Sequence, residues 1–341
     1  MSENLPTYLS ISTNISSDLI ATIKRINPDK IGILVDENTR KHCLHLIDIN
    51  YDAIIEIGSG EVNKTLETCS HIWDKLTTAG FTRQSVLLNL GGGVIGDMGG
   101  FVAATFKRGM AFINIPTTLL SQVDASIGGK LGIDFKGLKN HIGLFQEPDK
   151  VLVNPTFLNT LPERELKSGF AEIIKHALIQ DPLQWEYLLS KEFKTLDWNE
   201  IIPKSIAIKN KVVQEDPREK GKRKILNYGH TIGHALETYF LTTSNPLLHG
   251  EAVALGMILE NQIAVEMGIL KPEINKAVEE YIRKIYDLPS EWPAYKLIEK
   301  FLTQDKKNDK EGFRLSLLSK IGSCTYDVLI SDTILKKVLD K

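Results

Sequence analysis

The sequence contains neither a long apolar run nor a cysteine framework. No uninterrupted apolar stretch approaches the roughly 18 residues of a membrane-spanning helix, and the opening MSENLPTYLSIST lacks the basic and apolar regions of a signal peptide. The three cysteines, Cys43, Cys69 and Cys324, lie far apart without a C-x-x-C pair, which argues against disulfides and against a thiolate zinc site. We therefore expect a cytoplasmic protein with no membrane partner.

An excess of charge of either sign is also lacking. Lysine and arginine total 41 and aspartate and glutamate total 43, which gives a net charge of −2 and indicates no nucleic-acid partner. An acidic ligand would have to be bound by basic residues gathered locally in a pocket. The 341 residues exceed the roughly 250–300 at which a single core stops growing, so two domains are expected.

Strand-like and helix-like segments alternate in the first half of the chain, which predicts a layered α/β domain. After Asn154-Pro155 the β-branched runs give way to stretches with 3.6-residue periodicity, which predict helices. The expected strands are 31–36, 53–57, 85–90, 112–115 and 151–153. The expected helices are 16–25, 64–79, a segment beginning near Gly96, 162–179, 201–214, 230–239, 251–267 and 271–286. We predict an α/β domain at 1–155 and a mainly α-helical domain at 156–341.

A glycine-rich stretch follows the expected strand SVLLNL. Gly91 to Gly96 reads GGGVIG and satisfies G-x-G-x-x-G, in the order strand, turn, helix that a dinucleotide site requires. A tight packing turn is the alternative. The acidic residue expected about 20 positions later is missing. Because an earlier strand end, Val35-Asp36-Glu37-Asn38, could supply the ribose-binding carboxylate, we predict a variant Rossmann-like nucleotide-binding domain.

Histidines and a carboxylate suggest a metal site in the second half. His230, His234 and Glu237 recur at i, i+4 and i+7 and form one polar stripe on a helix. His249 opens another helix, and Glu172 precedes Lys175 by one turn. One carboxylate and two imidazoles suit a catalytic Zn²⁺ or Co²⁺ better than a closed structural site. The alternatives are helix histidines with ordinary hydrogen bonds and a lysine that extends to solvent.

The ordered motifs along the chain resemble those of the 3-dehydroquinate synthase family, within the sugar phosphate cyclase superfamily. The motifs are GGGVIGDMGGF, PTTLLSQVDASIGGKLGID, GFAEIIKHALI, GHTIGHALE and LHGEAVALG, and the resemblance spans nearly the whole chain. It implies an N-terminal NAD-binding domain, a helical metal-binding domain, a cleft active site and a homodimer. It also implies the lyase reaction that converts 3-deoxy-D-arabino-heptulosonate 7-phosphate to 3-dehydroquinate and phosphate, with NAD reduced and reoxidised within the cycle.

The resemblance assigns roles to individual positions by their place in these motifs. The implied metal ligands are Glu172, His230 and His249. The implied catalytic residues are His234, Lys175, Lys130, Asp124 and Asn227. The implied substrate contacts are Arg108, which would act across the dimer, Lys130, Asn140, Lys175, Lys209, Arg223, Asn227, His234 and one of Lys306 and Lys307. The expected NAD contacts are Asp36, Asn38, Ser59, Gly60, Glu61, Val62, Asn63, Lys64, Gly93, Val94, Ile95, Gly96, Asp97, Thr117, Thr118, Lys130, Lys139, Phe157 and Thr160.

Three other functions remain as alternatives. A sister cyclase would act on glucose 6-phosphate or sedoheptulose 7-phosphate, substrates that lack the carboxylate. The full set Lys209, Arg223, Asn227 and His234 favours the substrate that has one. A metal-dependent polyol dehydrogenase would release NADH and would have no use for a cluster of cations. A non-catalytic nucleotide-binding relative would not need the complete set of ligands and lysines.

Overall fold

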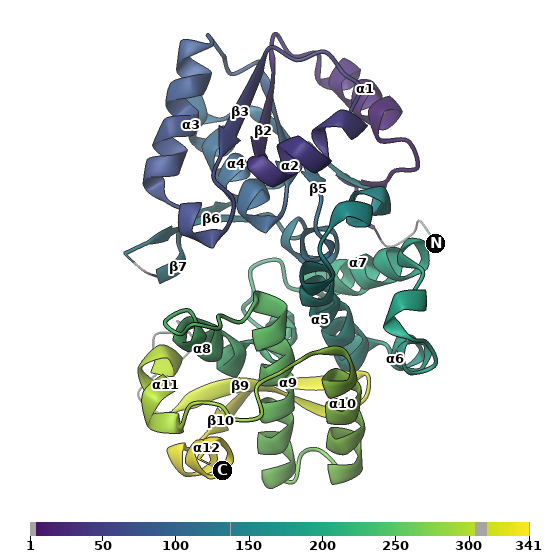
Figure 1. Ribbon diagram of the computed structural model, residues 1–341, viewed down its shortest axis with the longest axis vertical. Coiled ribbons are helices and arrows are strands. Elements are labelled where there is room, and N and C mark those ends of the chain that lie inside the picture. Colours follow the sequence, from purple (N-terminus) through teal and green to yellow (C-terminus); the bar gives the residue numbers. More distant parts are fainter. Residues whose placement is uncertain (1–4, 137, 304–311, 341) are drawn as a thin grey trace. The chain divides into compact units, whose positions relative to one another are not determined.

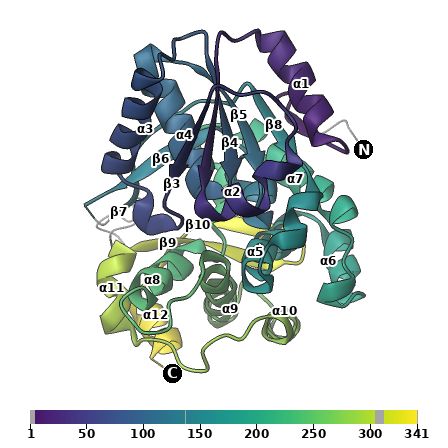
Figure 2. The same cartoon turned by 45° about the horizontal axis from the view of Figure 1, so that its top comes forward.

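The computed structural model describes residues 5–136, 138–303 and 312–340, and it divides into two compact units, Met1–Pro162 and Glu163–Lys341 (Figures 1 and 2). The first unit contains a parallel sheet with helices and the second is mainly helical, so the predicted fold class is confirmed. None of the helices in the described ranges combines the length and apolarity of a membrane span.

The sheet of the first unit has six parallel strands in the order β1-β8-β5-β4-β2-β3. Their bounds are β1 (Leu9–Ile11), β2 (Ile31–Asp36), β3 (Ala53–Ile57), β4 (Val86–Gly91), β5 (Ala111–Pro116) and β8 (Lys150–Val153). The predicted strands correspond to β2, β3, β4, β5 and β8. The central strands are nearly continuous apolar runs because both faces of a parallel sheet are covered.

Two apolar clusters lie on opposite faces of this sheet. Neighbouring residues of β2 alternate between them, with Leu34 in one cluster and Ile33 in the other. The helices of this unit are α1 (Ile15–Ile26), α2 (Glu37–His42), α3 (Leu66–Thr78) and α4 (Gly93–Thr105), with short turns η1 (Leu44–Leu46), η2 (Glu61–Asn63), η3 (Phe106–Arg108), the π-helical η4 (Ser121–Ala125) and η5 (Pro155–Thr160). The cluster containing Leu34 includes residues of α3 and α4, and the other includes Leu19 of α1.

The chain changes direction across the sheet between β2 and β4. From β2 it proceeds outward to β3, then returns through α3 to β4 on the other side and continues outward to β5. Ligands of open parallel sheets bind at such a switch point, outside the carboxyl ends of the strands. The glycine-rich stretch follows β4 at this point.

The helix after β4 begins earlier than predicted. It begins at Gly93, with Gly92 as its N-cap, and not near Gly96. Gly93 and Gly96 therefore belong to the first turn of α4. Glycine has a low helix propensity, which is why the sequence pattern suggested a longer loop.

The second unit is built around α9 (His249–Glu266), whose residues are buried on nearly all sides (Figure 1). Such an all-round burial is typical of a core helix. The other helices are α5 (Glu163–Gln180), α6 (Pro182–Leu189), α7 (Trp198–Glu215), α8 (His230–Phe240), α10 (Pro272–Ile285), α11 (Tyr295–Thr303) and α12 (Asp332–Leu339), with turns η6 (Phe193–Thr195) and η7 (Lys222–Asn227).

Two antiparallel hairpins were not predicted from the sequence. They are β6 (Lys130–Phe135) with β7 (Leu138–Phe145) in the first unit, and β9 (Phe313–Lys320) with β10 (Ser323–Ile330) in the second. Both contain register irregularities, at Ile133/Phe135 and at Thr325/Val328. A bulge interrupts the period-two alternation by which strands are recognised, so the pattern was weak in both places.

A close approach between β4 and α4 gives the first testable prediction. A Cβ on Gly99 would lie 2.0 Å from Oδ1 of Asn89, whose amide donates a hydrogen bond of 2.9 Å to buried Asn114. Gly99→Ala should therefore displace Asn89 and lower the free energy of unfolding by about 1–3 kcal/mol. Gly93→Ala is the matched control, since its Cβ would meet Ala125 at an ordinary 3.5 Å. Urea unfolding of both variants measures the difference, and equal midpoints would contradict this packing.

Candidate active site

The nucleotide contacts expected from the sequence gather at one edge of the first unit's sheet. Asp36 ends β2, the segment 59–64 follows β3, Gly93 to Asp97 follow β4, Thr117 and Thr118 follow β5, and Phe157 and Thr160 follow β8. Because these strands are parallel, their carboxyl ends share one edge. Along the sequence these segments lie up to 124 positions apart, from residue 36 to residue 160. The order of the strands in the sheet brings their ends to a common side.

A cavity lies at the end of β4. The glycines Gly92, Gly93 and Gly96 line it, together with Asn89, Gly91, Asp97, Asn114, Pro116, Ser121, Ala125, Ser126, Gly129, Lys130, Leu131, Gln146 and Pro148. The N-cap of α4 is Gly92, which has no side chain to cap the helix. An anion can therefore approach the first amide groups of this helix, which fits the pyrophosphate of a dinucleotide.

Lys64 connects three segments beside this cavity. Its ammonium group is nearly buried and lies 2.7 Å from Oδ2 of Asp97 and 2.7 Å from Oδ1 of Asn140. Burial alone would lower the pKa of Lys64, but the nearby carboxylates of Asp97 and Glu61 outweigh it, so the pKa is raised. Lys64 therefore stays charged and fixes Asp97 and Asn140.

Other predicted residues of the first unit have defined local roles. Asp36 accepts a hydrogen bond of 2.7 Å from the amide of Thr39 and caps α2, while Thr118 bonds to Ser121 at the start of η4. Asp124 lies in η4 and Lys139 in β7. Arg108 is exposed and has the left-handed backbone conformation with φ of 69°. Asn38 lies in α2.

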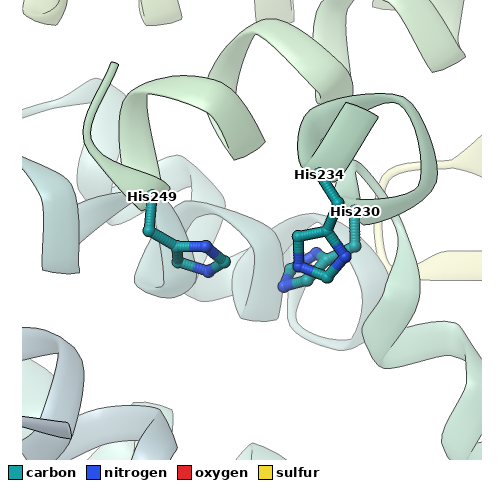
Figure 3. A group of neighbouring side chains, drawn as sticks. All are labelled: His230, His234 and His249. Atoms are coloured by element: carbon teal, nitrogen blue, oxygen red, sulfur yellow. The ribbon is translucent and has the colours of Figure 1, made fainter. Parts of the chain in front are cut away.

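The second unit brings Glu172, His230 and His249 together. Oε1 of Glu172 lies 3.4 Å from Nε2 of His230 and 3.8 Å from Nε2 of His249. Figure 3 shows His230 and His234 projecting from α8 and His249 from the start of α9, with their rings around a common space. One nitrogen from each of these three rings lies within 4.8 Å of the others.

Hydrogen bonds orient both ligand-type imidazoles. Nδ1 of His230 lies 3.1 Å from the carbonyl oxygen of Tyr228, and Nδ1 of His249 lies 3.3 Å from Oε2 of Glu237. These partners assign the proton to Nδ1 in each ring, so each Nε2 directs a lone pair toward Glu172. Burial, and then the nearby charge of Lys175, holds the pKa of His230 well below 6.5, which favours the neutral, ligating form.

The buried carboxylate of Glu172 completes this arrangement of acceptors. Lys175 forms an ion pair with Oε2, yet neither oxygen accepts a hydrogen bond of good geometry from the described residues. Two ligand atoms about 2.1 Å from one tetrahedral ion lie about 3.4 Å apart. The separation between Glu172 and His230 matches that spacing, so the donor set fits a divalent metal. Lys175 is 1% exposed and does not extend to solvent.

Contacts between α5 and the start of α9 place His249. The amide of Gly250 donates to Oγ of Ser168 at 3.0 Å, and Arg164 donates to both oxygens of Glu251 at 2.7 Å. Glu251 in turn accepts the amide of Leu248 at 2.8 Å. This cap begins α9 at His249, two residues before the predicted start, and makes His249 its first residue.

The predicted substrate residues of the second unit that the structure describes lie on α5, α7, η7 and α8. Lys209 and Arg223 are 6% and 2% exposed, so these cations are held inside the unit rather than in solvent. Arg223 donates to the carbonyl of Pro217 at 2.8 Å, and Asn227 donates to Glu219 at 2.7 Å. His234 lies one turn beyond His230 on α8. Lys306 and Lys307 lie outside the described residues.

Several residues at these sites were not assigned roles from the sequence. Asn89 and Asn114 line the cavity from β4 and β5, Glu219 contacts Asn227, and Glu237 contacts His249. The sequence signal for Glu237 was its place on the polar stripe of α8. Asn89 could have been found as a polar residue inside an otherwise apolar strand.

Glu237 gives a second prediction. A carboxylate on the outer nitrogen of a ligating histidine fixes the ring and raises its basicity. Glu237→Gln keeps an acceptor but loses the charge, so we expect metal affinity to fall roughly 10-fold. Competition with a chromophoric chelator measures the affinity. Glu279→Gln, which removes a surface ion pair with Arg283, is the control and should leave the metal affinity unchanged. Equal metal affinities for the two variants would contradict the role of Glu237.

The two sites together define a class of protein. A cavity at the carboxyl edge of a parallel sheet and a carboxylate–imidazole cluster with metal-ligand spacing are typical of a nucleotide-dependent metalloenzyme. Residues 54–168 match the family described as 3-dehydroquinate synthase N-terminal, and residues 169–308 match 3-dehydroquinate synthase C-terminal. The chain belongs to the 3-dehydroquinate synthase family, as the resemblance of its motifs implied.

Curated relatives and solved structures are similar over nearly the whole chain. The 3-dehydroquinate synthase of Parabacteroides distasonis is 38% identical over 97% of this chain and 95% of its own. That of a Sulfurovum species is also 38% identical, over 99% and 98%. A 2-deoxy-scyllo-inosose synthase structure with carbaglucose-6-phosphate, NAD⁺ and Co²⁺ has a TM-score of 0.82 at 26% identity over 97% and 95%. The 2-epi-5-epi-valiolone synthase from Streptomyces hygroscopicus subsp. jinggangensis, with NAD⁺ and Zn²⁺, has a TM-score of 0.85 at 24% identity over 99% and 97%, which supports the fold alone.

Proposed function

We propose that this protein converts 3-deoxy-D-arabino-heptulosonate 7-phosphate to 3-dehydroquinate and phosphate, as a lyase of the shikimate route to aromatic amino acids. The observation that carries the proposal is the similarity, at 38% identity over nearly the full length, to relatives named 3-dehydroquinate synthase. The two sites support it. The first unit has an open glycine-lined cavity for a dinucleotide, and the second has a cluster of acceptors for a divalent metal.

We assign NAD to the first unit and Zn²⁺ or Co²⁺ to Glu172, His230 and His249 in the second. When bound, NAD supplies a reversible hydride acceptor and the metal supplies Lewis acidity at the substrate hydroxyls. The uncapped start of α4 would bind the pyrophosphate, and the segments after β2, β3 and β5 would bind the rest of the dinucleotide. Lys130 and Lys139 add positive charge on β6 and β7.

The remaining residues bind the substrate and move protons. Lys175, Lys209 and Arg223 are buried cations, and such groups form strong charge-assisted hydrogen bonds with phosphate and carboxylate. His234, one turn from His230, would exchange a proton with the C5 oxygen. Asn227 and Asn140 would orient hydroxyls, while Asp124 would help to position the reacting centre. The protein thus mainly orients the substrate and stabilises its charge.

A sister cyclase function is the second candidate, because solved structures with the same fold include cyclases of that kind. Three substrates separate the two: the heptulosonate phosphate, glucose 6-phosphate and sedoheptulose 7-phosphate. The proposal expects phosphate release from the first at a kcat/KM at least about 10⁴-fold above the others, since buried cations left without a carboxylate are strongly disfavoured. Comparable or faster release from either of the other sugars would overturn the assignment.

We also propose that the enzyme is a homodimer in which Arg108 reaches the substrate phosphate of the partner subunit. The exposure of Arg108 and its unusual left-handed backbone at a turn between α4 and β5 support this role. Light scattering would give the mass in solution. Arg108→Ala should raise KM for the substrate while leaving NAD binding unchanged, and a monomeric mass with full activity would contradict the proposal.

A further inference from the structure

A buried carboxylate outside the expected ligand set lies at the start of α8. Glu260, in the middle of α9, is fully buried. Its Oε2 accepts the amide of Gly229 at 2.6 Å, and its Oε1 accepts the amide of Ile232 at 3.2 Å. Gly229 is the N-cap of α8 and Ile232 is its third residue. His230, the first residue of the helix, lies between them. Both oxygens of Glu260 are thus directed at the turn that carries His230.

This turn cannot be capped by its own residues. The N-cap is Gly229, which has the left-handed φ of 78° and no side chain. A Cβ at Gly229 would lie 2.5 Å from Cγ of Met257, and one at Gly256 would lie 2.0 Å from the carbonyl oxygen of Gly229. The backbones of α8 and α9 are therefore too close for an ordinary serine, threonine or aspartate cap. The cap has to come from the neighbouring helix.

The residue after Glu260 holds the other end of the same turn. Oδ1 of Asn261 accepts the hydroxyl of Tyr228 at 2.8 Å, and both residues are fully buried. The carbonyl of Tyr228 is the group that lies 3.1 Å from Nδ1 of His230. Glu260 therefore fixes the peptide between Tyr228 and Gly229 through its amide, and Asn261 fixes the Tyr228 side chain. The carbonyl of that same peptide orients the His230 ring.

A carboxylate suits this place for two reasons. It accepts two amides at once, whereas a neutral amide side chain has one acceptor oxygen. Its negative charge also lies at the positive end of the α8 dipole. The carboxylate thus stabilises the start of α8 and holds the turn that carries His230.

We propose that Glu260 is a positioning residue for the metal centre: it caps α8 from α9 and thereby holds the His230 imidazole against Glu172. The inference rests on the proposed metal site. Outer groups that orient ligands typically contribute 10–100-fold to metal affinity. Glu260→Ala should therefore bind Co²⁺ roughly 10–100-fold more weakly than the parent, and Glu260→Gln, which keeps one acceptor, should lie between them.

The experiment titrates Co²⁺ into metal-free full-length protein and its variants, with affinity from calorimetry and ligand geometry from the visible absorption bands. Ile258→Ala is the control: it also removes a fully buried side chain from α9, but two residues before Glu260 and so on the opposite side of the helix. We expect Ile258→Ala to lower the denaturation midpoint without changing the Co²⁺ affinity or the absorption bands. The Glu260 variants should change the Co²⁺ affinity and the absorption bands.

The outcomes separate the proposals. If folded Glu260→Ala kept the Co²⁺ affinity and absorption bands of the parent, the positioning role would be overturned. An equal loss of Co²⁺ affinity in Ile258→Ala would overturn it too, since the effect would then be general destabilisation. If Glu260→Ala does not fold, Glu260→Gln decides by the same criteria. Failure of the parent to bind Co²⁺ would contradict the proposed metal site and the inference with it, whereas binding by the parent with unaffected variants contradicts the inference alone.

Discussion

His230→Ala is expected to leave a folded protein that neither retains a divalent metal nor turns over. The variant removes one of the two imidazoles that direct Nε2 toward Glu172, and the remaining carboxylate and His249 lie 3.8 Å apart. A Lewis acid lowers the activation free energy by several kcal/mol, and each 1.36 kcal/mol changes the rate about tenfold. The kcat should therefore fall by about 10³-fold or more. Elemental analysis after dialysis gives the metal content, and circular dichroism checks the fold.

The matched control for this variant is His71→Ala. His71 is exposed on α3 in the first unit and contributes to neither site. It should retain parental metal content and parental turnover. Since the His230 side chain is only 12% exposed, some loss of stability is expected in His230→Ala. If its unfolding midpoint stays close to that of the parent, the loss of activity follows from the loss of the metal. Full metal content and activity in His230→Ala would remove this residue from the ligand set.

Lys175→Met is expected to separate metal binding from turnover. Lys175 and Glu172 form a buried ion pair with 1% and 0% of the two residues exposed. In the metal-free variant the Glu172 carboxylate has lost the lysine that pairs with it, which should lower the free energy of unfolding by about 3–5 kcal/mol. A bound metal restores a positive charge beside Glu172. Because Lys175 repels a metal cation, its removal should leave the affinity for the metal equal or higher.

Turnover by Lys175→Met should nevertheless fall by about 10²–10⁴-fold, because the cation that we propose binds the anionic substrate is lost. Calorimetric metal titration, thermal unfolding with and without metal, and phosphate release give the three quantities. Lys167→Met, which removes a more exposed lysine of the same helix from its ion pair with Glu163, should alter stability by about 0.5 kcal/mol or less. Weaker metal binding together with unchanged turnover would contradict the role assigned to Lys175.

The sequence predicted those parts of the fold that are specified locally. In the run IGILVD every residue before Asp36 is apolar, because β2 is buried on both faces, and its predicted bounds agree with the structure. The stripe of His230, His234 and Glu237 requires only helical periodicity, so it too was visible in the sequence. Glu172 and His249 were noted from the sequence as a carboxylate and an imidazole on other helices, and the motif resemblance then implied that they bind a metal together with His230, which periodicity alone could not have shown.

The features that the sequence did not predict depend on how distant segments pack. Glu260 reads as a polar residue within an apolar helix, and its role exists only because α8 and α9 approach at Gly229 and Gly256. The bulged hairpin β6–β7, which carries Lys130 and Asn140, has no regular alternation. The earlier start of α4 at Gly93 was hidden by glycines that usually end helices rather than begin them.

The central claim is that NAD is a recycled oxidant in a metal-dependent reaction with no net redox change. The most direct measurement incubates the metal-loaded enzyme with the heptulosonate phosphate and much less NAD⁺ than substrate, and follows free phosphate together with NADH absorbance. We expect phosphate in large excess over the NAD⁺ supplied, with no lasting NADH. One NADH formed for each substrate consumed, with turnover ending when NAD⁺ is exhausted, would contradict it.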